Sequence, residues 1–597
     1  MTTALSSNPV TRTIRTVRVG PLTGGGFWGV LAVAVAYLAI SIPQWGQPWV
    51  IDEAVFPYVA DGILKNGAPV FYNGELRPTD IGLWHPPLYD YLLAGFVGIF
   101  GFSTFSVRAF GAVCVLLAVF FLTLAMRRIA PSMPQVGYVA LSALVLLNPL
   151  VISGALVPDI DTSLGFLVVV LALWLATILK QEELTLKLGI WLAAFATLSI
   201  ATKLVMSGFV AVILGVAALL SRTQRWRKVL ALIGAFVVGT AVAMALMFLA
   251  GAIIGFDARL PFDYLFTSLG ARTPGRSGLA GAFAAFATGP GSSLVWIGPA
   301  IFIAAIAAAI LIGWRRPKGV DANLVIFMAA AGLVIVIGYA FISASPFLFP
   351  KYTPIAVPAF ALAATTLLML VPGRLLVGLR RPRALVIVIS YFAILVIGTV
   401  GMFALAARNE RIHRRTLEDL VLLSIAAFIA VVIVTAIAIV LLRSPKDGET
   451  RPAFTTALAS AALIALVVTP VMAQTSTSLV NATVPYASRY YYGERGMQAF
   501  LKEAAALMPE DSSVIAAKDV GFQLPRAFYE DALLFAQPVD EFRDFIESEE
   551  VAFFVTRRIH DYSEPVYPEH YEVIKEFYTP ILDDPDQDFV LWELKAD

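Results

Sequence analysis

The stretch VLALIGAFVVGTAVAMALMFLAGAI, at residues 229–253, carries no charged side chain from one end to the other. A helix of about 20 apolar residues can cross the hydrocarbon of a membrane, because it satisfies its own backbone hydrogen bonds there. The residues directly before it, RWRK at 225–228, are cations and a tryptophan, which suit the membrane surface. The sequence therefore predicts a membrane-spanning helix.

The composition indicates that this stretch is one of many. Of the 597 residues, 59% are hydrophobic and 14% are charged, whereas about 25% are charged in soluble domains. That balance excludes an ordinary soluble protein. The single cysteine, Cys114, lies inside an apolar run and cannot form an internal disulfide. We count about thirteen apolar runs of spanning length, near 27–45, 105–126, 136–153, 162–179, 187–201, 204–221, 229–253, 294–313, 323–343, 353–371, 385–407, 420–442 and 455–473.

The distribution of Lys and Arg predicts how these spans are oriented, because short loops rich in them stay on the cytoplasmic side. Arginines in the basic arm at 1–24 place the N-terminus inside, and alternate loops from there are again basic. The outside loop at 408–419 carries four arginines and departs from the rule. An odd number of spans then places residues 474–597 outside. We expect a multi-pass protein of the cell membrane.

Residues 474–597 have more acids and aromatic side chains, and only short apolar runs. Strand-like and helix-like stretches alternate there, which is typical of an α/β domain. The strand-like stretches lie at 513–517, 551–555 and 589–594, and the helix-like stretches at 496–507 and 539–548. The predicted fold is thus an all-α polytopic membrane domain at 25–473, followed by a soluble α/β domain.

The first outside loop, at 46–104, carries acids next to the membrane. Asp52 and Glu53 precede a stretch whose apolar residues share one face of a helix, which we expect to lie in the membrane interface. Asp61 and Lys65 fall on the polar face of that helix. Asp52 and Glu53 could cap the helix, because its dipole favours acids there, or they could take part in chemistry.

His85 and two prolines precede a short apolar stretch at 88–100. If this stretch crossed the membrane, Arg127 and Arg128 would fall outside, so we expect it to be re-entrant or interfacial. His85 would lie in a rigid turn at the outer surface. A lone histidine is more often structural than catalytic.

Further charged residues lie within or beside the later spans. Asp159 and Asp161 fall at the membrane boundary, where they could cap the next helix or belong to a site. Lys203 lies deep in apolar sequence, where a charge costs about 2.5–3.5 kcal/mol, so it either reaches the surface or has a partner or a role. Lys351 and Tyr352, which are flanked by prolines, suggest a shaped site.

These residues together predict carboxylates and cations at one membrane surface. A carboxylate can take a proton from a hydroxyl group, cations can bind a phosphate, and an apolar body suits a lipid. The combination favours an enzyme that transfers a group from a lipid phosphate to an outside acceptor. A transporter or lipid flippase is the main alternative, because charges in spans also mark ion pathways. A scaffold whose C-terminal domain binds wall polymer or protein is a third.

Seven short motifs carry a family resemblance. They are DE at 52–53, LKNG at 64–67, HPPLYDYLL at 85–93, IFGFSTFSVRAFGAV at 99–113, VPDIDTSLGF at 157–166, ATKLVMSGF at 201–209 and FPKYTPIAVPAFAL at 349–362. In order and spacing they resemble the GT-C fold glycosyltransferases that use polyprenyl-phosphate sugars. The nearest patterns are those of the aminoarabinose lipid A transferases and the protein O-mannosyltransferases.

The resemblance implies that a sugar is transferred with inversion to an acceptor hydroxyl on the outer face. Asp52 would be the general base, Glu53 would orient it, and Asp159 matches the acid of the second outer loop. His85 falls where many members have a lysine that is implied to contact the donor phosphate. The other predicted ligands of the donor phosphate are Arg108, Lys203, Lys351 and Tyr352.

The resemblance implies no nucleotide donor and no obligatory metal, although Asp159 and Asp161 form a DxD pair that could hold a divalent cation. The expected partners are a polyprenyl-phosphate-linked hexose or pentose, the membrane, and a lipid, glycan or protein acceptor, with no nucleic acid. The outside loop at 255–293 has acids and arginines among glycines. We expect this loop to influence the choice of acceptor.

Overall fold

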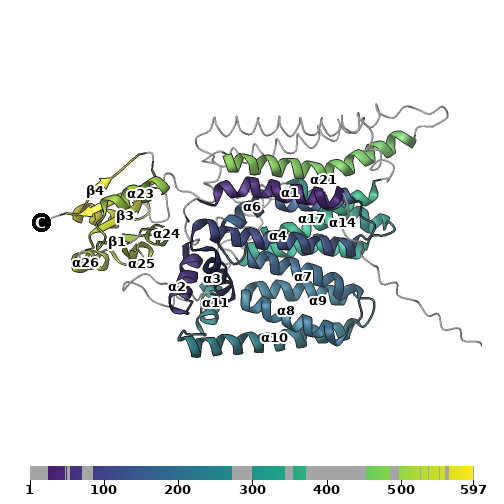
Figure 1. The fold of residues 1–597 in the computed structure, drawn as a ribbon, viewed down its shortest axis with the longest axis horizontal. Helices are drawn as coiled ribbons and strands as arrows, with labels where there is room; N and C mark the ends of the chain where they lie inside the picture. Colours follow the sequence, from purple (N-terminus) through teal and green to yellow (C-terminus); the bar gives the residue numbers. More distant parts are fainter. Residues whose placement is uncertain are drawn as a thin grey trace, which may run out of the picture.

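A computed structural model describes residues 25–46, 49, 54–69, 85–271, 299–342, 354–371, 452–483 and 497–595, the last range without 525, 536, 550, 559–563 and 586. The described chain forms a body of helices that lie roughly along one direction, with a small domain of helices and strands beyond one end (Figure 1). The mostly helical body and the small C-terminal sheet agree with the predicted fold class.

The helices of the body follow the apolar runs. Their bounds are α1 Gly25–Ser41, α4 Thr104–Ile129, α5 Gln135–Leu146, α6 Pro149–Leu156, α7 Leu164–Gln181, α8 Leu186–Thr202, α9 Leu204–Leu219, α10 Arg225–Ile254, α14 Pro299–Arg315, α15 Ala322–Ile342, α17 Val357–Thr365 and α21 Pro452–Thr483. In the part of the chain that the structure describes, four helices are long and apolar enough to cross a membrane, or five if one bent pair counts as a span. The runs at 385–407 and 420–442 lie outside the described residues, so the number of spans stays a prediction.

Two polar contacts fix the directions of α7, α8 and α9. Lys203, before α9, pairs with Asp161, before α7. At the other end the Ser221 hydroxyl, after α9, donates to the carbonyl of Lys180 in α7, at 3.2 Å. Helices α7 and α9 are therefore parallel, and α8 returns antiparallel to both. Lys203 is the one residue between α8 and α9 and has an extended backbone, so the sequence around it forms a hairpin.

The apolar run at 136–153 is a bent pair of helices and not one straight span. Helices α5 and α6 meet at an angle of 57°. Pro149 begins α6, where its missing N–H costs no hydrogen bond, and the Asn148 side chain accepts from the backbone N–H of Leu150 at 2.9 Å. The bend also leaves the carbonyl of Leu147 to accept from the Ser478 hydroxyl at 3.0 Å. Ser478 belongs to α21, which extends to Thr483, beyond the predicted end of the last span at residue 473.

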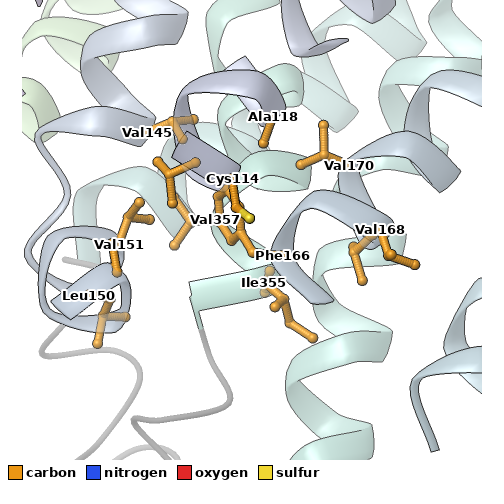
Figure 2. Close-up of a cluster of buried hydrophobic side chains, with 14 of the residues drawn as sticks. Cys114, Ala118, Val145, Leu150, Val151, Phe166, Val168, Val170, Ile355 and Val357 are labelled. Atoms are coloured by element: carbon orange, nitrogen blue, oxygen red, sulfur yellow. The ribbon is translucent and has the colours of Figure 1, made fainter. Parts of the chain in front are cut away.

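The core of the body lies where α4, α5, α6, α7 and α17 pack together. Cys114 is 4% exposed among branched aliphatic side chains and Phe166, so the single cysteine is a packing residue (Figure 2). Gly111 of α4 permits a close approach to α6, because a Cβ there would lie 2.5 Å from the carbonyl oxygen of Ala155. Together these contacts fix α6 on α4, and with it the loop that follows α6.

The C-terminal domain is built on a five-stranded sheet of order β2-β1-β3-β5-β4. Strand β1 is parallel to β2 and β3, whereas β5 is antiparallel to β3 and β4. The predicted strands are β1, β3 and β5, and the predicted helices are α23 and α26; the two edge strands β2 and β4 were not predicted. The bounds are α23 Met497–Leu507, β1 Ser513–Ala516, α24 Lys518–Gly521, β2 Ala527–Glu530, α25 Asp531–Phe535, α26 Val539–Glu549, β3 Phe553–Arg557, α27 Pro568–Phe577, β4 Tyr578–Leu582 and β5 Phe589–Leu594.

Three helices cover the end of the body that faces this domain (Figure 1). They are α2 Val55–Asn66, α3 Leu88–Phe100 and α11 Leu260–Ala271. The predicted helix after Glu53 is α2, which buries Phe56 and Val59 and pairs Lys65 with Asp61 at 2.6 Å on its polar face. Among the described residues the body also has the short 3-10 helices η1 Ile42–Gln44, η4 Pro354–Ala356 and η5 Thr366–Leu370.

Candidate functional site

The structure gathers several predicted residues at the end of the body nearest the C-terminal domain. His85 lies directly before α3, Asp159 and Asp161 lie directly before α7, and Lys203 lies between α8 and α9. The Tyr89 side chain of α3 is within hydrogen-bonding reach of Ser163, in the loop before α7. Segments that are far apart in the chain, those of α3 and of the loop before α7, therefore meet at one place.

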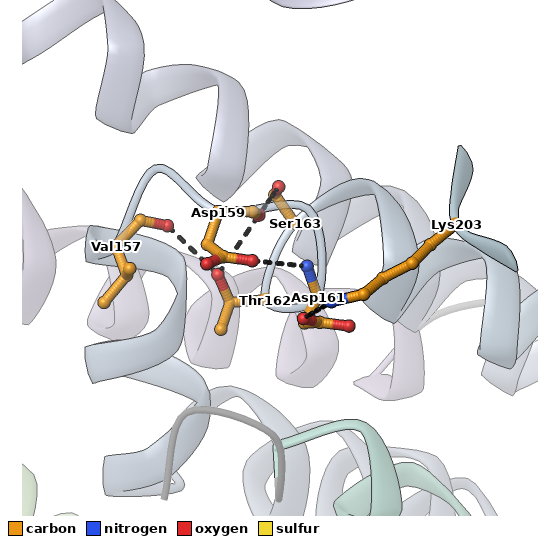
Figure 3. A network of polar contacts seen from close by, with 6 residues as sticks. All are labelled: Val157, Asp159, Asp161, Thr162, Ser163 and Lys203. Atoms are coloured by element: carbon orange, nitrogen blue, oxygen red, sulfur yellow. Dashed lines mark hydrogen bonds and ion pairs between the residues drawn. The ribbon is translucent and has the colours of Figure 1, made fainter. Parts of the chain in front are cut away.

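The loop between α6 and α7 is a tightly bonded turn around Asp159 (Figure 3). The carboxylate of Asp159 accepts from the backbone N–H of Asp161 at 3.0 Å, and its backbone carbonyl accepts from the Ser163 hydroxyl. Thr162 donates to the carbonyl of Val157 at 3.0 Å. Asp159 is only 3% exposed. These bonds hold the carboxylate in one position, as a reacting or binding group requires.

Asp161 forms a buried ion pair with Lys203 (Figure 3). The side chains are 0% and 9% exposed, respectively. Either charge alone would be strongly unfavourable in so buried a place, so each depends on the other. The sequence left two explanations for Lys203, a partner or a path to the surface, and the structure shows the partner. Ser163 is the N-cap residue of α7, so Asp161 does not cap that helix by position.

Helix α3 adds two buried residues that sequence reasoning did not single out, Tyr89 and Asp90. Tyr89 packs edge-on against Phe56 of α2, with ring centroids 5.3 Å apart. Asp90 is 1% exposed, and among the described residues its Oδ1 has no hydrogen-bond partner. Its place in the first turn of α3 is one where the helix dipole favours an acid. An acid within the apolar motif HPPLYDYLL was the signal that could have identified it.

Arg108 lies near this site, but its guanidinium holds the backbone together. It is 1% exposed, its Nε donates to the carbonyl of Leu156 at 2.9 Å, and its Nη1 donates to the carbonyl of Trp45 at 3.0 Å. Leu156 ends α6, and Trp45 follows η1. This geometry favours a structural role for Arg108; its predicted contact with a donor phosphate stays a prediction.

Four predicted site residues lie outside the described residues: Asp52, Glu53, Lys351 and Tyr352. Their described neighbours nevertheless belong to this end of the body. Ala54 is buried and is the N-cap residue of α2. Pro354 packs against Gly154 of α6, beside Thr162.

The possible metal site at Asp159 and Asp161 can be compared only with the part of the chain that the structure describes. There, no group of three or more His, Cys, Asp or Glu side chains could hold a metal ion. Asp161, one of the two acids of the DxD pair, pairs with Lys203. The chemistry of the described site is that of fixed carboxylates and a compensated cation in an apolar setting.

Known proteins resemble this chain in sequence and in fold. The sequence model of the dolichyl-phosphate-mannose-protein mannosyltransferases matches residues 84–249, the part that contains His85, Asp159 and Lys203. ArnT from Cupriavidus metallidurans, solved with undecaprenyl phosphate, is 16% identical with a TM-score of 0.58, over 96% of this chain and 99% of that one. Its apo structure is also 16% identical, with a TM-score of 0.56, over 95% and 97%. No curated protein matches in sequence. These similarities confirm the resemblance to the GT-C glycosyltransferases.

Proposed function

On the premise that the chain has the fold of ArnT and the mannosyltransferase pattern over residues 84–249, we propose that it is a membrane glycosyltransferase. It takes a sugar from a polyprenyl-phosphate donor and gives it to an acceptor hydroxyl on the extracytoplasmic face. The observation that carries the proposal is the buried loop of Asp159, which Lys203 fixes through Asp161 and which α3, the helix after His85, approaches through Tyr89. His85, Asp159 and Lys203 all lie inside the matched segment.

The proposed reaction is a single displacement at the anomeric carbon. The acceptor oxygen forms the new glycosidic bond while the bond between the sugar and the lipid phosphate breaks, and the phosphate leaves with the electron pair. Asp52 takes the proton of the acceptor hydroxyl, with Glu53 beside it. Asp159, held by its turn, is the second fixed acid of the site.

The ion pair of Lys203 and Asp161 limits which groups can compensate the leaving phosphate. The pair adds no net charge, and Arg108 already donates to two carbonyls. We assign the compensation of the phosphate charge to Lys351 and to His85 when it is protonated. Arg108 keeps its positive charge, because carbonyl groups do not cancel it, and it contributes from its fixed position. In this assignment Lys203 contributes chiefly by fixing the Asp159 loop.

The orientation is part of the proposal. Arg128, Glu182 and Lys228 lie at the end of the body opposite α2 and α3, and basic loops favour the cytoplasmic side. The C-terminal domain would then be extracytoplasmic. The variant Asp540→Cys, at an exposed position of α26, should react with a membrane-impermeant thiol reagent in whole cells, with the buried Cys114 as the silent background. Protection at 540 would overturn this orientation.

The transfer itself is tested with full-length protein in lipid nanodiscs, supplied with polyprenyl-phosphate hexose or pentose and with lipid, glycan or peptide acceptors. We expect transfer by the wild type and a loss of about 100-fold or more in Asp52→Asn, because a general base contributes about that much. Asp544→Asn, the same change at an exposed position of α26, is the matched control. Equal rates in Asp52→Asn and the wild type would exclude the assigned base; no transfer with any pair would exclude the function.

A further inference from the structure

The C-terminal domain contacts the membrane body at Trp49, in the connection between α1 and α2. The side-chain amide of Gln523 donates from Nε2 to the carbonyl of Trp49 at 2.7 Å and accepts at Oε1 from its N–H at 2.9 Å. Both backbone groups of one residue are thus paired by one side chain from the turn after α24. Such a two-point contact fixes orientation as well as position, as neighbouring strands do in a sheet.

Aromatic side chains connect the same part of the C-terminal domain to α2. The Tyr58 ring of α2 stacks on Phe522, with centroids 4.6 Å apart, and its hydroxyl donates to the carbonyl of Phe522. Trp49 in turn packs edge-on against Tyr58 at 5.4 Å and against Phe102 at 5.8 Å. Phe522 is 5% exposed and Trp49 is 4% exposed. The contact is therefore desolvated, which strengthens its hydrogen bonds.

The same connection is held from the membrane body four residues earlier in the chain, at Trp45. Arg108 of α4 binds the carbonyl of Trp45 and the carbonyl of Leu156, at the end of α6. The chain leading into α2 is therefore fixed at one point by the body and at another by the C-terminal domain. Helix α2 then contacts α3 through Phe56 and Tyr89.

We propose that Gln523 is a positioning residue for the transferase: through Trp49, the C-terminal domain sets the place of α2, and thereby of Tyr89 beside the Asp159 loop. The C-terminal domain is then required for full catalytic activity, because it positions α2. This inference rests on the proposed function only for its effect on turnover. The position of α2 can be measured without the reaction.

The first measurement is amide hydrogen exchange on the full-length protein in nanodiscs. Gln523→Ala should speed exchange across residues 54–66 several-fold and leave the strands β1, β3 and β5 unchanged. Tyr58→Phe, which keeps the ring and removes only the hydroxyl, should show a smaller change in the same segment. Unchanged exchange in 54–66, or faster exchange throughout the sheet, would overturn the positioning role.

The second measurement separates kcat from KM. Because a misplaced α2 would disturb the alignment of the reacting groups, we expect about a tenfold loss of kcat in Gln523→Ala, with KM for the donor within about twofold of wild type. Gln537→Ala is the matched control, since Gln537 uses its backbone carbonyl to bind His570. A wild-type kcat in Gln523→Ala would overturn the coupling. If the wild type transfers no sugar, the proposed function fails, and hydrogen exchange alone decides the role of Gln523.

Discussion

Each end of the helical body has an ion pair between a basic and an acidic side chain, but one pair is buried and the other is exposed to solvent. Near the C-terminal domain, Lys203 and Asp161 are 9% and 0% exposed. At the far end the side chains of Arg128 and Glu182 are 28% and 51% exposed, and the charged atoms of the two lie 2.6 Å apart. The pair of Lys180 and Asp321 is intermediate, with side chains that are 8% and 25% exposed. All three pairs join segments that are distant in the chain.

The comparison shows that burial, and not the presence of a pair, decides what a charge does. Exposed pairs contribute about 0–1 kcal/mol, because water solvates both partners when they separate. In a buried pair each partner depends on the other, because removing one leaves a buried charge without compensation, which is strongly unfavourable. The buried pair therefore fixes the Asp159 loop, whereas the exposed pair joins the C-terminal ends of α4 and α7.

The largest effect is expected at Lys203. Replacing it in Lys203→Met leaves Asp161 buried without its cation and should lower the free energy of unfolding by about 3–5 kcal/mol. The measurement is equilibrium unfolding in mixed micelles. The double variant Lys203→Met/Asp161→Leu should recover most of the loss, because it removes both charges. If the double variant were as unstable as the single one, the pair would not be the cause.

The next effect is expected at Arg108. Arg108→Met removes the donors for the carbonyls of Trp45 and Leu156 and should cost about 2–4 kcal/mol, since each buried acceptor left unsatisfied costs about 1–3 kcal/mol. The same unfolding measurement checks it. Arg108→Lys, which keeps the charge but has no planar fork, should recover only part of the loss. Full recovery by lysine would show that charge alone matters there.

A smaller effect is expected at Lys180, whose pair with Asp321 is partly exposed. Lys180→Met should cost about 1–2 kcal/mol, between the limits for exposed and buried pairs. Asp321 would keep its other contacts, because its carboxylate also accepts from the backbone N–H of Leu324 at 3.3 Å. A loss as large as that of Lys203→Met would break the proposed dependence on burial.

The smallest effect is expected at Arg128. Arg128→Gln should change the free energy of unfolding by less than about 1 kcal/mol, and added salt should shrink the difference further. Unfolding at low and high salt checks both statements. A salt-independent loss of several kcal/mol would mean that the pair with Glu182 is shielded from water.

The sequence predicted those features that follow from local patterns. The face of α2, with Asp61 and Lys65 on its polar side, follows from helical periodicity, and three of the five strands follow from short apolar runs. The bend before α6 escaped prediction, because Asn148 and Pro149 interrupt an otherwise apolar run by only two residues. The edge strands β2 and β4 are short and carry polar residues, so they gave no clear strand pattern.

For the candidate site, the sequence marked charges in unfavourable surroundings but could not assign their partners. Lys203 was recognisable as costly from its neighbours alone. Asp161, which compensates it, lies 42 residues away in the chain. Asp90 was missed because it lies inside the stretch at 88–100, which was interpreted from its apolar residues. Its burial becomes visible only when α2 and α4 pack around α3.

By itself the sequence determined that this chain is a membrane protein with an α/β domain at its end, because hydropathy and periodicity are local properties of a segment. Only the tertiary structure decided that Lys203 forms an ion pair with Asp161 and that Arg108 donates hydrogen bonds to backbone carbonyls. It likewise decided that Gln523 reaches Trp49, 474 residues away in the chain. The reason is physical: an ion pair or hydrogen bond depends on a distance of a few ångströms in space, and the packing of helices sets that distance.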